Sequence, residues 1–353
     1  MSPDAGLRAA ALEPPRALGL SLVAARCRTV PEDFEVEEQL GFAPSGQGAH
    51  LLLRVRKIGA NTAWVARELA RAARCRPHDV GYAGLKDRNA VALQWFSVPR
   101  PRAPLELAGL RGEGFEVLEA HAHARKLPRG ALAGNHFRIR LRGAGPAGEL
   151  AATLRPGIEA IARRGVPNYF GPQRFGRDGA NLDRIPEDPR SLAAPERGFV
   201  LSAARSAVFN AQLGARVHDG SWERLGAGDL AVLDGRGSFF AVQDAADPGL
   251  AERCARLEIH PSGPLWGAGP SPAAAAVAQR EAAVAAGLAR ACRACELAGM
   301  RQERRALRLR VAALALAAQA DAVLISFQLT RGSFATAVLR ELVEGAELPG
   351  GES

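Results

Sequence analysis

The segment from Asn135 to Arg142 alternates strictly between two kinds of side chain. Phe137, Ile139 and Leu141 are apolar, and histidine or arginine occupies the positions between them. This period of two is typical of a β-strand, whose successive side chains point to opposite faces. We therefore expect one face of the strand to pack against a core while the other carries arginines. The arginine face fits two interpretations, a solvated polar surface or a surface turned towards phosphates.

The balance of charge favours the second interpretation. The chain of 353 residues has 46 basic and 37 acidic residues and a net charge of +9, which indicates a polyanionic partner, most often nucleic acid. Only Lys57, Lys86 and Lys126 are lysines, and the other cations are arginines, whose planar fork suits phosphates and stacks on bases. A general bias towards Ala, Gly and Arg would explain arginine in place of lysine but not the surplus over acid.

The segments of regular structure fall into three blocks. The first mixes strands with a helix that Asn61 can cap, and its expected elements are strands at 50–56, 91–98, 115–118 and 135–142 and a helix at 61–74. A middle block has loops rich in glycine and proline between helices, including those expected at 202–217 and 272–297. The last block has strands at 307–314 and 322–329 and a helix that starts at Gly332 and Ser333 and runs through Val343.

This order predicts a catalytic domain that an inserted domain interrupts, because strands return late in the chain to complete the sheet. The expected division is a variable leader at 1–25, a catalytic domain at 26–162 and 306–353, and an insertion at 163–305.

The cysteines and the apolar segments restrict the compartment. Five cysteines at irregular spacing argue against a disulfide framework and favour a reducing environment. Cys292 and Cys295 lie in an Ala-rich helical run without a second pair, so helix packing explains them better than a zinc site. No apolar run approaches the roughly 18 residues of a membrane span. The apolar stretch 17–25 follows acids and prolines, where a signal peptide needs cations. We therefore expect a cytoplasmic protein.

The run from Gly81 to Val98 presents one carboxylate, Asp87, between Lys86 and Arg88. Flanking positive charge favours an ionised carboxylate, which can act as a nucleophile or a base. The alternative is a surface turn residue. A lone aspartate does not suit hydrolysis of glycosides by paired acids, and no HExxH, serine elbow or P-loop occurs. If the chain is an enzyme, it is expected to work through this carboxylate and no metal.

The run from Val166 to Gly176, VPNYFGPQRFG, is dense in aromatic residues for this chain. Tyr169 and Phe170 can stack on exposed bases, and Arg174 can meet phosphates or base edges. The alternative is a loop that its aromatic residues attach to the core.

A third run, from Gly143 to Gly148, fits the G-x-G-x-x-G pattern of a dinucleotide-binding turn. The acidic residue expected about 20 positions later is missing, and Pro146 lacks the amide that a pyrophosphate would use. A nicotinamide-dependent oxidoreductase is therefore a minor alternative.

The first two runs resemble the TruD family of pseudouridine synthases. That family has a catalytic aspartate in a G-x-K-D segment and an N-Y-F-G-x-Q-R-F-G run at the entrance to its insertion domain. Further runs that look like family segments are 31–34, 201–206, 209–210, 235–238, 332–336 and 339–342. The similarity covers about 26–344. Two positions depart from it: Asn89 stands where histidine is expected, and Thr330-Arg331 where relatives often have Pro-Ala.

The resemblance implies an α+β fold, in which a pseudouridine-synthase catalytic domain with a mixed, mainly antiparallel sheet is interrupted by a helix-richer TRUD insertion. It implies a tRNA pseudouridine synthase that isomerises uridine 13 in the D-arm, binds RNA through a basic cleft, uses no cofactor and acts as a monomer. An RNA-binding protein that kept the fold without turnover is the alternative from another class.

The resemblance also assigns roles to single residues. Asp87 would be the nucleophile, and Phe137 would stack on the target base. Asn135 would contact the substrate from the same strand. The other expected substrate-binding residues are Phe34, Phe334, Lys86, Arg88 and Arg174, of which Lys86 and Arg88 would also hold Asp87 ionised.

Overall fold

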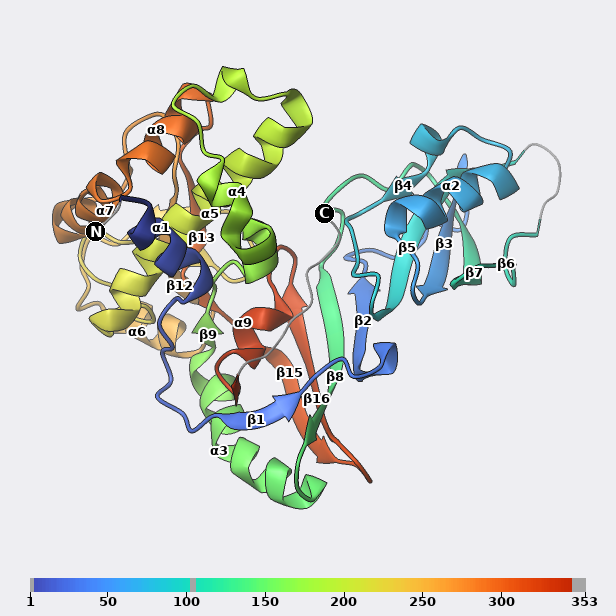
Figure 1. Ribbon diagram of the computed structural model, residues 1–353, viewed down its shortest axis with the longest axis horizontal. Helices are drawn as coiled ribbons and strands as arrows, with labels where there is room; N and C mark the ends of the chain where they lie inside the picture. Colours follow the sequence, from blue (N-terminus) through green and yellow to red (C-terminus); the bar gives the residue numbers. More distant parts are fainter. Residues whose placement is uncertain (1–2, 102–105, 345–353) are drawn as a thin grey trace. The chain divides into compact units, whose positions relative to one another are not determined.

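The computed structural model describes residues 3–101 and 106–344 (Figure 1). The chain divides into two compact units. Within the described residues, the sheet unit comprises 23–155, 312–332 and Glu344, and the helical unit comprises 3–22, 156–311 and 333–343. These units differ from the expected division at both ends of the chain, because the residues before Val23 and the segment 333–343 belong to the helical unit.

The sheet unit is built on one mixed sheet with the strand order β15-β16-β8-β2-β5-β3-β7-β6. Strands β2 and β5 run parallel, and every other neighbouring pair in this order is antiparallel. The strands are β2 (Phe34–Gln39), β3 (His50–Lys57), β5 (Val91–Pro99), β6 (Arg111–Gly112), β7 (Phe115–His123), β8 (Gly134–Gly143), β15 (Ala312–Ala318) and β16 (Val323–Thr330), with the short β1 (Val23–Arg26) and β4 (Gly81–Tyr82). The two-residue strand β17 (Val343–Glu344) contains the last division between the units. The predicted α+β fold with a mainly antiparallel mixed sheet is confirmed.

Strand β8 is the segment whose alternation was clearest in the sequence. Its apolar residues Phe137, Ile139 and Leu141 are buried, as predicted. Its arginines, however, form ion pairs inside the unit. Arg140 bonds Glu35 at 2.7 Å, and Arg142 bonds Asp33 at 2.8 Å. These cross-strand pairs neutralise much of the positive charge that the sequence suggested for phosphates.

Helix α2 (Thr62–Ala72) covers β3, β5 and β7 in the sheet unit (Figure 1). Val65 and Leu69 are fully buried against residues such as Leu53 and Phe96. Their spacing of four places both on one face of the helix, so the amphipathic pattern explains why the helix packs there. The helix starts directly after Asn61, as predicted, although the Asn61 side chain makes no capping hydrogen bond.

The helical unit surrounds the long helix α5 with short helices and a small antiparallel sheet of order β11-β10-β12-β13. Its helices are α1 (Pro3–Leu12), α4 (Ala180–Asp183), α5 (Ala194–His218), α6 (Pro248–Ala255), α7 (Ala275–Ala286), α8 (Ala289–Leu297) and α9 (Ala335–Leu339). Its strands are β9 (Val166–Pro167), β10 (Leu230–Leu233), β11 (Phe239–Ala241), β12 (Ile259–Leu265), β13 (Glu303–Ala306) and β14 (Arg308–Leu309). Helix α3 (Ala147–Arg164) contains the division between the units.

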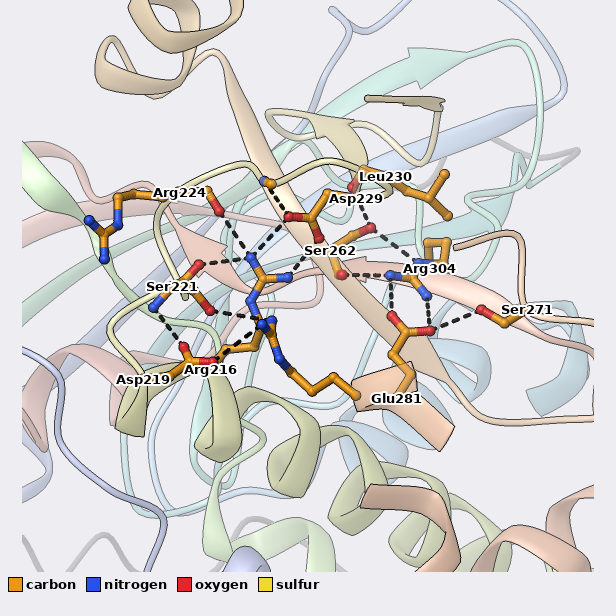
Figure 2. Close-up of polar contacts among 12 residues, drawn as sticks. Arg216, Asp219, Ser221, Arg224, Asp229, Leu230, Ser262, Ser271, Glu281 and Arg304 are labelled. Carbon is orange, nitrogen blue, oxygen red and sulfur yellow. Dashed lines mark hydrogen bonds and ion pairs between the residues drawn. The ribbon is translucent and has the colours of Figure 1, made fainter. Parts of the chain in front are cut away.

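Two buried ion pairs connect the elements of the helical unit (Figure 2). Arg216 on α5 bonds Asp229, which precedes β10, at 2.6 Å. Arg304 on β13 bonds Glu281 on α7 at 2.8 Å and also contacts Ser262 on β12. Since a buried charge is costly unless it is paired, these contacts fix the positions of the elements that carry them.

Three predictions about helices need correction. The expected helix at 272–297 is two helices, because α7 ends at Ala286 and α8 starts at Ala289. The expected last helix is only α9, with Phe334 rather than Ser333 at its N-cap. The expected leader includes α1 and belongs to the helical unit, where Glu341 accepts hydrogen bonds from the amides of Ala17 and Leu18 at 3.1 and 3.2 Å.

In the part of the chain that the structure describes, no helix is long and apolar enough to cross a membrane.

Candidate active site

Asp87 lies in the loop that connects β4 to β5, and its side chain is 13% exposed. Its Oδ1 atom accepts a hydrogen bond from the amide of Asn89 at 2.9 Å, an arrangement that turns the chain locally. Its Oδ2 atom forms an ion pair with the Arg28 guanidinium. The carboxylate is therefore held at both oxygens, and one of them faces a cation.

Arg28 is one residue of this site that the sequence did not reveal. It follows β1, has a positive φ of 80°, and its side chain is 6% exposed. Its guanidinium carbon lies 3.9 Å from the ring centroid of Phe34. Arg28 thus joins the expected nucleophile to one of the expected substrate-binding rings. It is 59 residues from Asp87 in the chain, so no local motif could indicate the contact.

Phe34 and Phe137 are brought together by the pairing of β2 with β8. Val36 is the register partner of Phe137, and Phe34 is that of Ile139, so both rings lie on the same face. Their centroids are 6.0 Å apart in an edge-to-face arrangement. Phe327 on β16 lies 5.4 Å from Phe137 on its other side. The rings make an aromatic cluster in which Phe34 contacts Arg28.

Asn135 stands two residues before Phe137 and therefore shares a face of β8 with it. Its Oδ1 atom is buried, and within the described residues it has no hydrogen-bond partner. A buried acceptor without a donor costs free energy. A bound molecule that supplies an N–H group would remove that cost.

Lys86 and Arg88, expected to hold Asp87 ionised, contact other groups. Lys86 Nζ pairs with the fully buried Glu38 at 2.7 Å. Arg88 Nε donates to the carbonyl of Gly59 at 2.9 Å and is exposed to solvent. The structure gives the direct ion pair with Asp87 to Arg28 instead. Proximity in the sequence was misleading here, because Arg88 lies in a turn, where the conformation of the loop directs each side chain separately.

Lys57 holds the loop that carries Asp87, a role that no pattern in the sequence indicated. It is at the end of β3 and is fully buried. Its Nζ atom donates to the carbonyls of Ala60 at 2.8 Å, Lys86 at 3.0 Å and Asp87 at 3.0 Å. An ammonium group has three donors, so one lysine can bond all three of these carbonyls.

Two other side chains also bond to this loop, namely Thr62 at the start of α2 and Gln94 on β5. The hydroxyl of Thr62 accepts from the amide of Lys86 at 3.1 Å. The amide of Gln94 donates to the carbonyl of Gly84 at 2.7 Å. The backbone at Asp87 and just before it is thereby fixed by largely buried polar contacts, which is the preorganisation that a reacting group needs.

Arg174 and Phe334 belong to the helical unit and gather there around Phe170. The guanidinium carbon of Arg174 lies 5.4 Å from the Phe170 ring centroid and 5.8 Å from that of Phe334. The two rings are 5.9 Å apart. The expected site residues therefore form two sets, one around Asp87 in the sheet unit and one around Phe170 in the helical unit.

Two other sequence features received a structural explanation. The glycine run at 143–148 lies between β8 and α3, but α3 leads to β9, which pairs with β14. A dinucleotide-binding unit requires the strand after the helix to return and lie beside the strand before it. Strand β9 does not pair with β8, so this requirement is not met.

Cys292 and Cys295 are buried on α8 as free thiols, in agreement with helix packing. In the described part of the chain, no cluster of three or more His, Cys, Asp or Glu side chains is placed to hold a metal.

The fold of the whole chain is that of the pseudouridine synthases. A solved chain from Methanosarcina mazei, provisionally described as tRNA pseudouridine synthase D (TruD), superposes with a TM-score of 0.74. The match covers 96% of this chain and 97% of that chain at 20% sequence identity, which defines the class of fold.

The sequence itself defines the family more narrowly. The family model of tRNA pseudouridine synthase D (TruD) matches residues 19–186 and 190–342. The tRNA pseudouridine synthase D of Xanthomonas axonopodis is 45% identical over 94% of this chain and 95% of its own length. That of Methylococcus capsulatus is 46% identical, with 94% of each chain covered, and that of Nitrosococcus oceani is 43% identical over 96% of this chain and 94% of its own. The chain therefore belongs to the tRNA pseudouridine synthase D (TruD) family.

Proposed function

We propose that this chain isomerises uridine 13 in the D-arm of tRNA to pseudouridine, with Asp87 as the nucleophile. The observation that carries the proposal is the setting of Asp87 in a chain of this family. The loop carboxylate is ion-paired to Arg28, and Arg28 in turn contacts the ring of Phe34. A carboxylate with a fixed backbone and a cation at one oxygen is suited to nucleophilic attack.

The proposed reaction rearranges one nucleotide. Asp87 attacks the target nucleotide, the bond from C1′ to N1 breaks, and the uracil turns while it stays in the site. A bond from C1′ to C5 then forms and the bond to Asp87 breaks. C5 loses its proton, and N1, which has lost its bond to C1′, carries a proton in its place. Neither oxidation nor net hydrolysis occurs, so the reaction balances without a cofactor. Arg28 would keep Asp87 positioned as charge develops at the reacting bond.

The aromatic cluster supports the handling of a base outside its helical stack. Extraction of a base costs a few kcal/mol, and a ring that stacks on the base returns part of that free energy. Phe137, beside Phe34, is proposed to supply that ring. Asn135, with its buried Oδ1 lacking a donor, is proposed to accept a hydrogen bond from the N3–H group of uracil.

The remaining expected residues are proposed to contact RNA or to support the site. Phe334 and Arg174 would bind RNA from the helical unit, and the exposed Arg88 would contact a phosphate. Lys86 would act mainly through its ion pair with Glu38, which holds the Asp87 loop. We further propose a monomer that acts on tRNA in the cytoplasm and binds it through a basic cleft.

The direct test is to compare the wild-type chain with Asp87→Asn on unmodified tRNA, followed by mapping of pseudouridine. The expected result is a product at position 13 with the wild type, and tight binding without product with the variant. Undiminished product from the variant would contradict the nucleophile assignment. Product at another position would contradict the assignment of the target uridine.

The same experiment distinguishes the proposed enzyme from the alternative, an RNA-binding protein without turnover. That alternative predicts equal binding by both chains and no pseudouridine from either. The ion pair between Arg28 and Asp87 favours the enzyme, because binding alone does not require a positioned carboxylate.

A further inference from the structure

The loop 124–133, which joins β7 to β8 in the sheet unit, is attached to the glycine-rich run that leads to the candidate nucleophile. The amide of Gly130 donates to the carbonyl of Ala83 at 2.7 Å. The amide of Leu127 donates to the hydroxyl of Ser97 on β5 at 2.8 Å. The position of this loop relative to the run is therefore fixed by hydrogen bonds.

The ends of two neighbouring strands hold the same loop. The amide of Ala133 donates to the carbonyl of Gln39, the last residue of β2, at 2.9 Å. Directly after β16, the amide of Arg331 donates to the carbonyl of Ala133 at 3.2 Å, and its Nη1 atom donates to the carbonyl of Gly130 at 3.4 Å. A side chain on this loop is thus carried by a well-fixed backbone.

Arg129, at the tip of the loop, stacks on the ring of Tyr82. Its guanidinium carbon lies 3.8 Å from the ring centroid, a distance typical of a cation–π contact. Tyr82 in turn packs against the fully buried ring of Phe96, with centroids 5.8 Å apart. The guanidinium therefore rests on a ring that the core holds in place, although Arg129 itself is exposed.

The stacked guanidinium keeps its hydrogen-bond donors. Within the described residues, the side chain of Arg129 makes no hydrogen bond or ion pair. Stacking uses the face of the guanidinium, whereas its N–H groups point outwards in the plane. The loop contains three cations and no acid, so no neighbouring carboxylate on it neutralises the charge. Arg129 thus presents a preorganised fork to an anion from outside the protein.

This fork lies close to the candidate nucleophile along the chain. Tyr82 is five residues before Asp87, which limits the distance between their Cα atoms to about 18 Å even for a fully extended segment. The contacts described above fix both ends of this segment. An anion bound by Arg129 would therefore be held at a constant, short distance from the reacting carboxylate.

We propose that Arg129, stacked on Tyr82, binds one phosphate of the RNA backbone close to the target uridine. The inference rests on the proposed function, because the RNA is the tRNA that this enzyme modifies. A phosphate is favoured over a base, since its two free oxygens match the guanidinium fork and its charge is opposite. The contact sets the position of the backbone relative to Asp87 while the base is outside its stack.

The first test identifies the ligand as a phosphate. A set of tRNAs, each with one neutral methylphosphonate in the D-arm, is bound to the Asp87→Asn chain, in which turnover does not interfere. At one linkage the neutral group is expected to weaken binding, and adding Arg129→Gln is expected to abolish that effect. Arg67→Gln is the matched control, because Arg67 is an exposed arginine on α2 of the same unit. The same sensitivity at every linkage with and without Arg129 would overturn the site.

The salt dependence of binding gives a second readout of the same contact. Loss of one phosphate contact lowers the slope of log K against log salt by about 0.7 to 0.9. Arg129→Gln is expected to lower it by one such step in the Asp87→Asn background. A lower slope without any change in the methylphosphonate pattern would show a general effect of charge and would contradict a specific site.

The role of the ring is tested by two substitutions of Tyr82. Tyr82→Phe keeps the stacking face and is expected to retain the affinity and the position-specific effect. Tyr82→Leu removes the face and is expected to weaken binding to the level of Arg129→Gln. Combining Tyr82→Leu with Arg129→Gln is expected to cause little further loss, because both remove the same contact. Fully additive losses would mean that the ring does not position Arg129.

The two proposals fail in different ways. If the wild-type chain bound tRNA with the expected interference pattern but produced no pseudouridine, the proposed function would be wrong and the phosphate site would stand. If it produced pseudouridine while Arg129→Gln changed neither slope nor interference pattern, the phosphate site would be wrong and the function would stand.

Discussion

The ammonium group of Lys57 donates a hydrogen bond of 3.0 Å to the backbone carbonyl of Asp87. Lys57 is fully buried at the end of β3, and its other two bonds reach the carbonyls of Ala60 and Lys86. One side chain therefore connects a central strand of the sheet to the backbone of the expected nucleophile. Lys57 is a positioning residue, because it acts on the reaction through Asp87.

Lys57→Met is expected to lower kcat strongly while the KM for tRNA changes little. The substitution removes the donor to one buried and two partly buried carbonyls. A buried acceptor without a donor costs about 1–3 kcal/mol, so the loop rearranges and Asp87 loses its position. Lys57→Arg is expected to recover part of kcat, because it restores a charged donor. Lys126→Met removes an exposed lysine and controls for the loss of one cation. A Lys57→Met enzyme that is folded and has wild-type kcat would contradict the positioning role.

Arg28→Gln is expected to reduce kcat and also to lower thermal stability, because Asp87 loses the partner of a largely buried ion pair. The change removes the ion pair to Asp87 and the contact with the Phe34 ring. Arg28→Lys keeps the charge but not the planar fork, so its kcat is expected to lie between those of the wild type and Arg28→Gln. The measurement is single-turnover formation of pseudouridine at saturating enzyme. Equal rates for all three chains would show that Arg28 has no part in the reaction.

Glu38→Gln is expected to destabilise the sheet unit by about 3–5 kcal/mol, because it removes one partner of a buried ion pair. Glu38 accepts from Lys86 Nζ at 2.7 Å and from the amide of Trp95 at 2.9 Å. The second substitution Lys86→Met removes the unpaired cation and is expected to restore part of the stability. A urea-unfolding cycle of the four chains measures the coupling. Strict additivity of the two single changes would disprove the interaction.

His260→Gln is expected to make the stability of the helical unit less sensitive to acid. His260 is buried between Asp234, at 3.1 Å, and Arg308, whose Nε donates to its Nδ1 at 3.1 Å. Arg310 also pairs with Asp234. Burial lowers the pKa of His260 in the folded protein, so the unfolded chain binds the proton more readily, and the stability that the neutral ring contributes is lost as the pH falls below about 6.5.

The measurement for His260 is the free energy of unfolding between pH 7.5 and about 5, the interval in which an unfolded histidine takes up its proton. The wild type is expected to lose more stability than His260→Gln over this interval. Carboxylates elsewhere titrate in both chains, so the difference between the two curves isolates this side chain. Parallel curves would mean that His260 titrates alike in the folded and unfolded states.

Much of the fold could be predicted because it depends on short-range patterns. The alternation around Phe137 identified β8, and the potential cap at Asn61 before a helical pattern identified α2. The motif around Asp87 pointed to the family that the sequence comparisons establish. The extents of the C-terminal helices and the attachment of 3–22 to the helical unit were not evident, because packing against distant segments decides them.

The sequence by itself determined the family, and it singled out Asp87, the one acid of a glycine-rich motif, as the expected nucleophile. Only the tertiary structure decided which cations form ion pairs with which acids. Lys86 and Arg88 are adjacent to Asp87, yet the ion pair comes from Arg28, 59 residues away. The physical reason is that strand register and loop conformation direct side chains, so contact in space follows the pairing of strands rather than proximity along the chain.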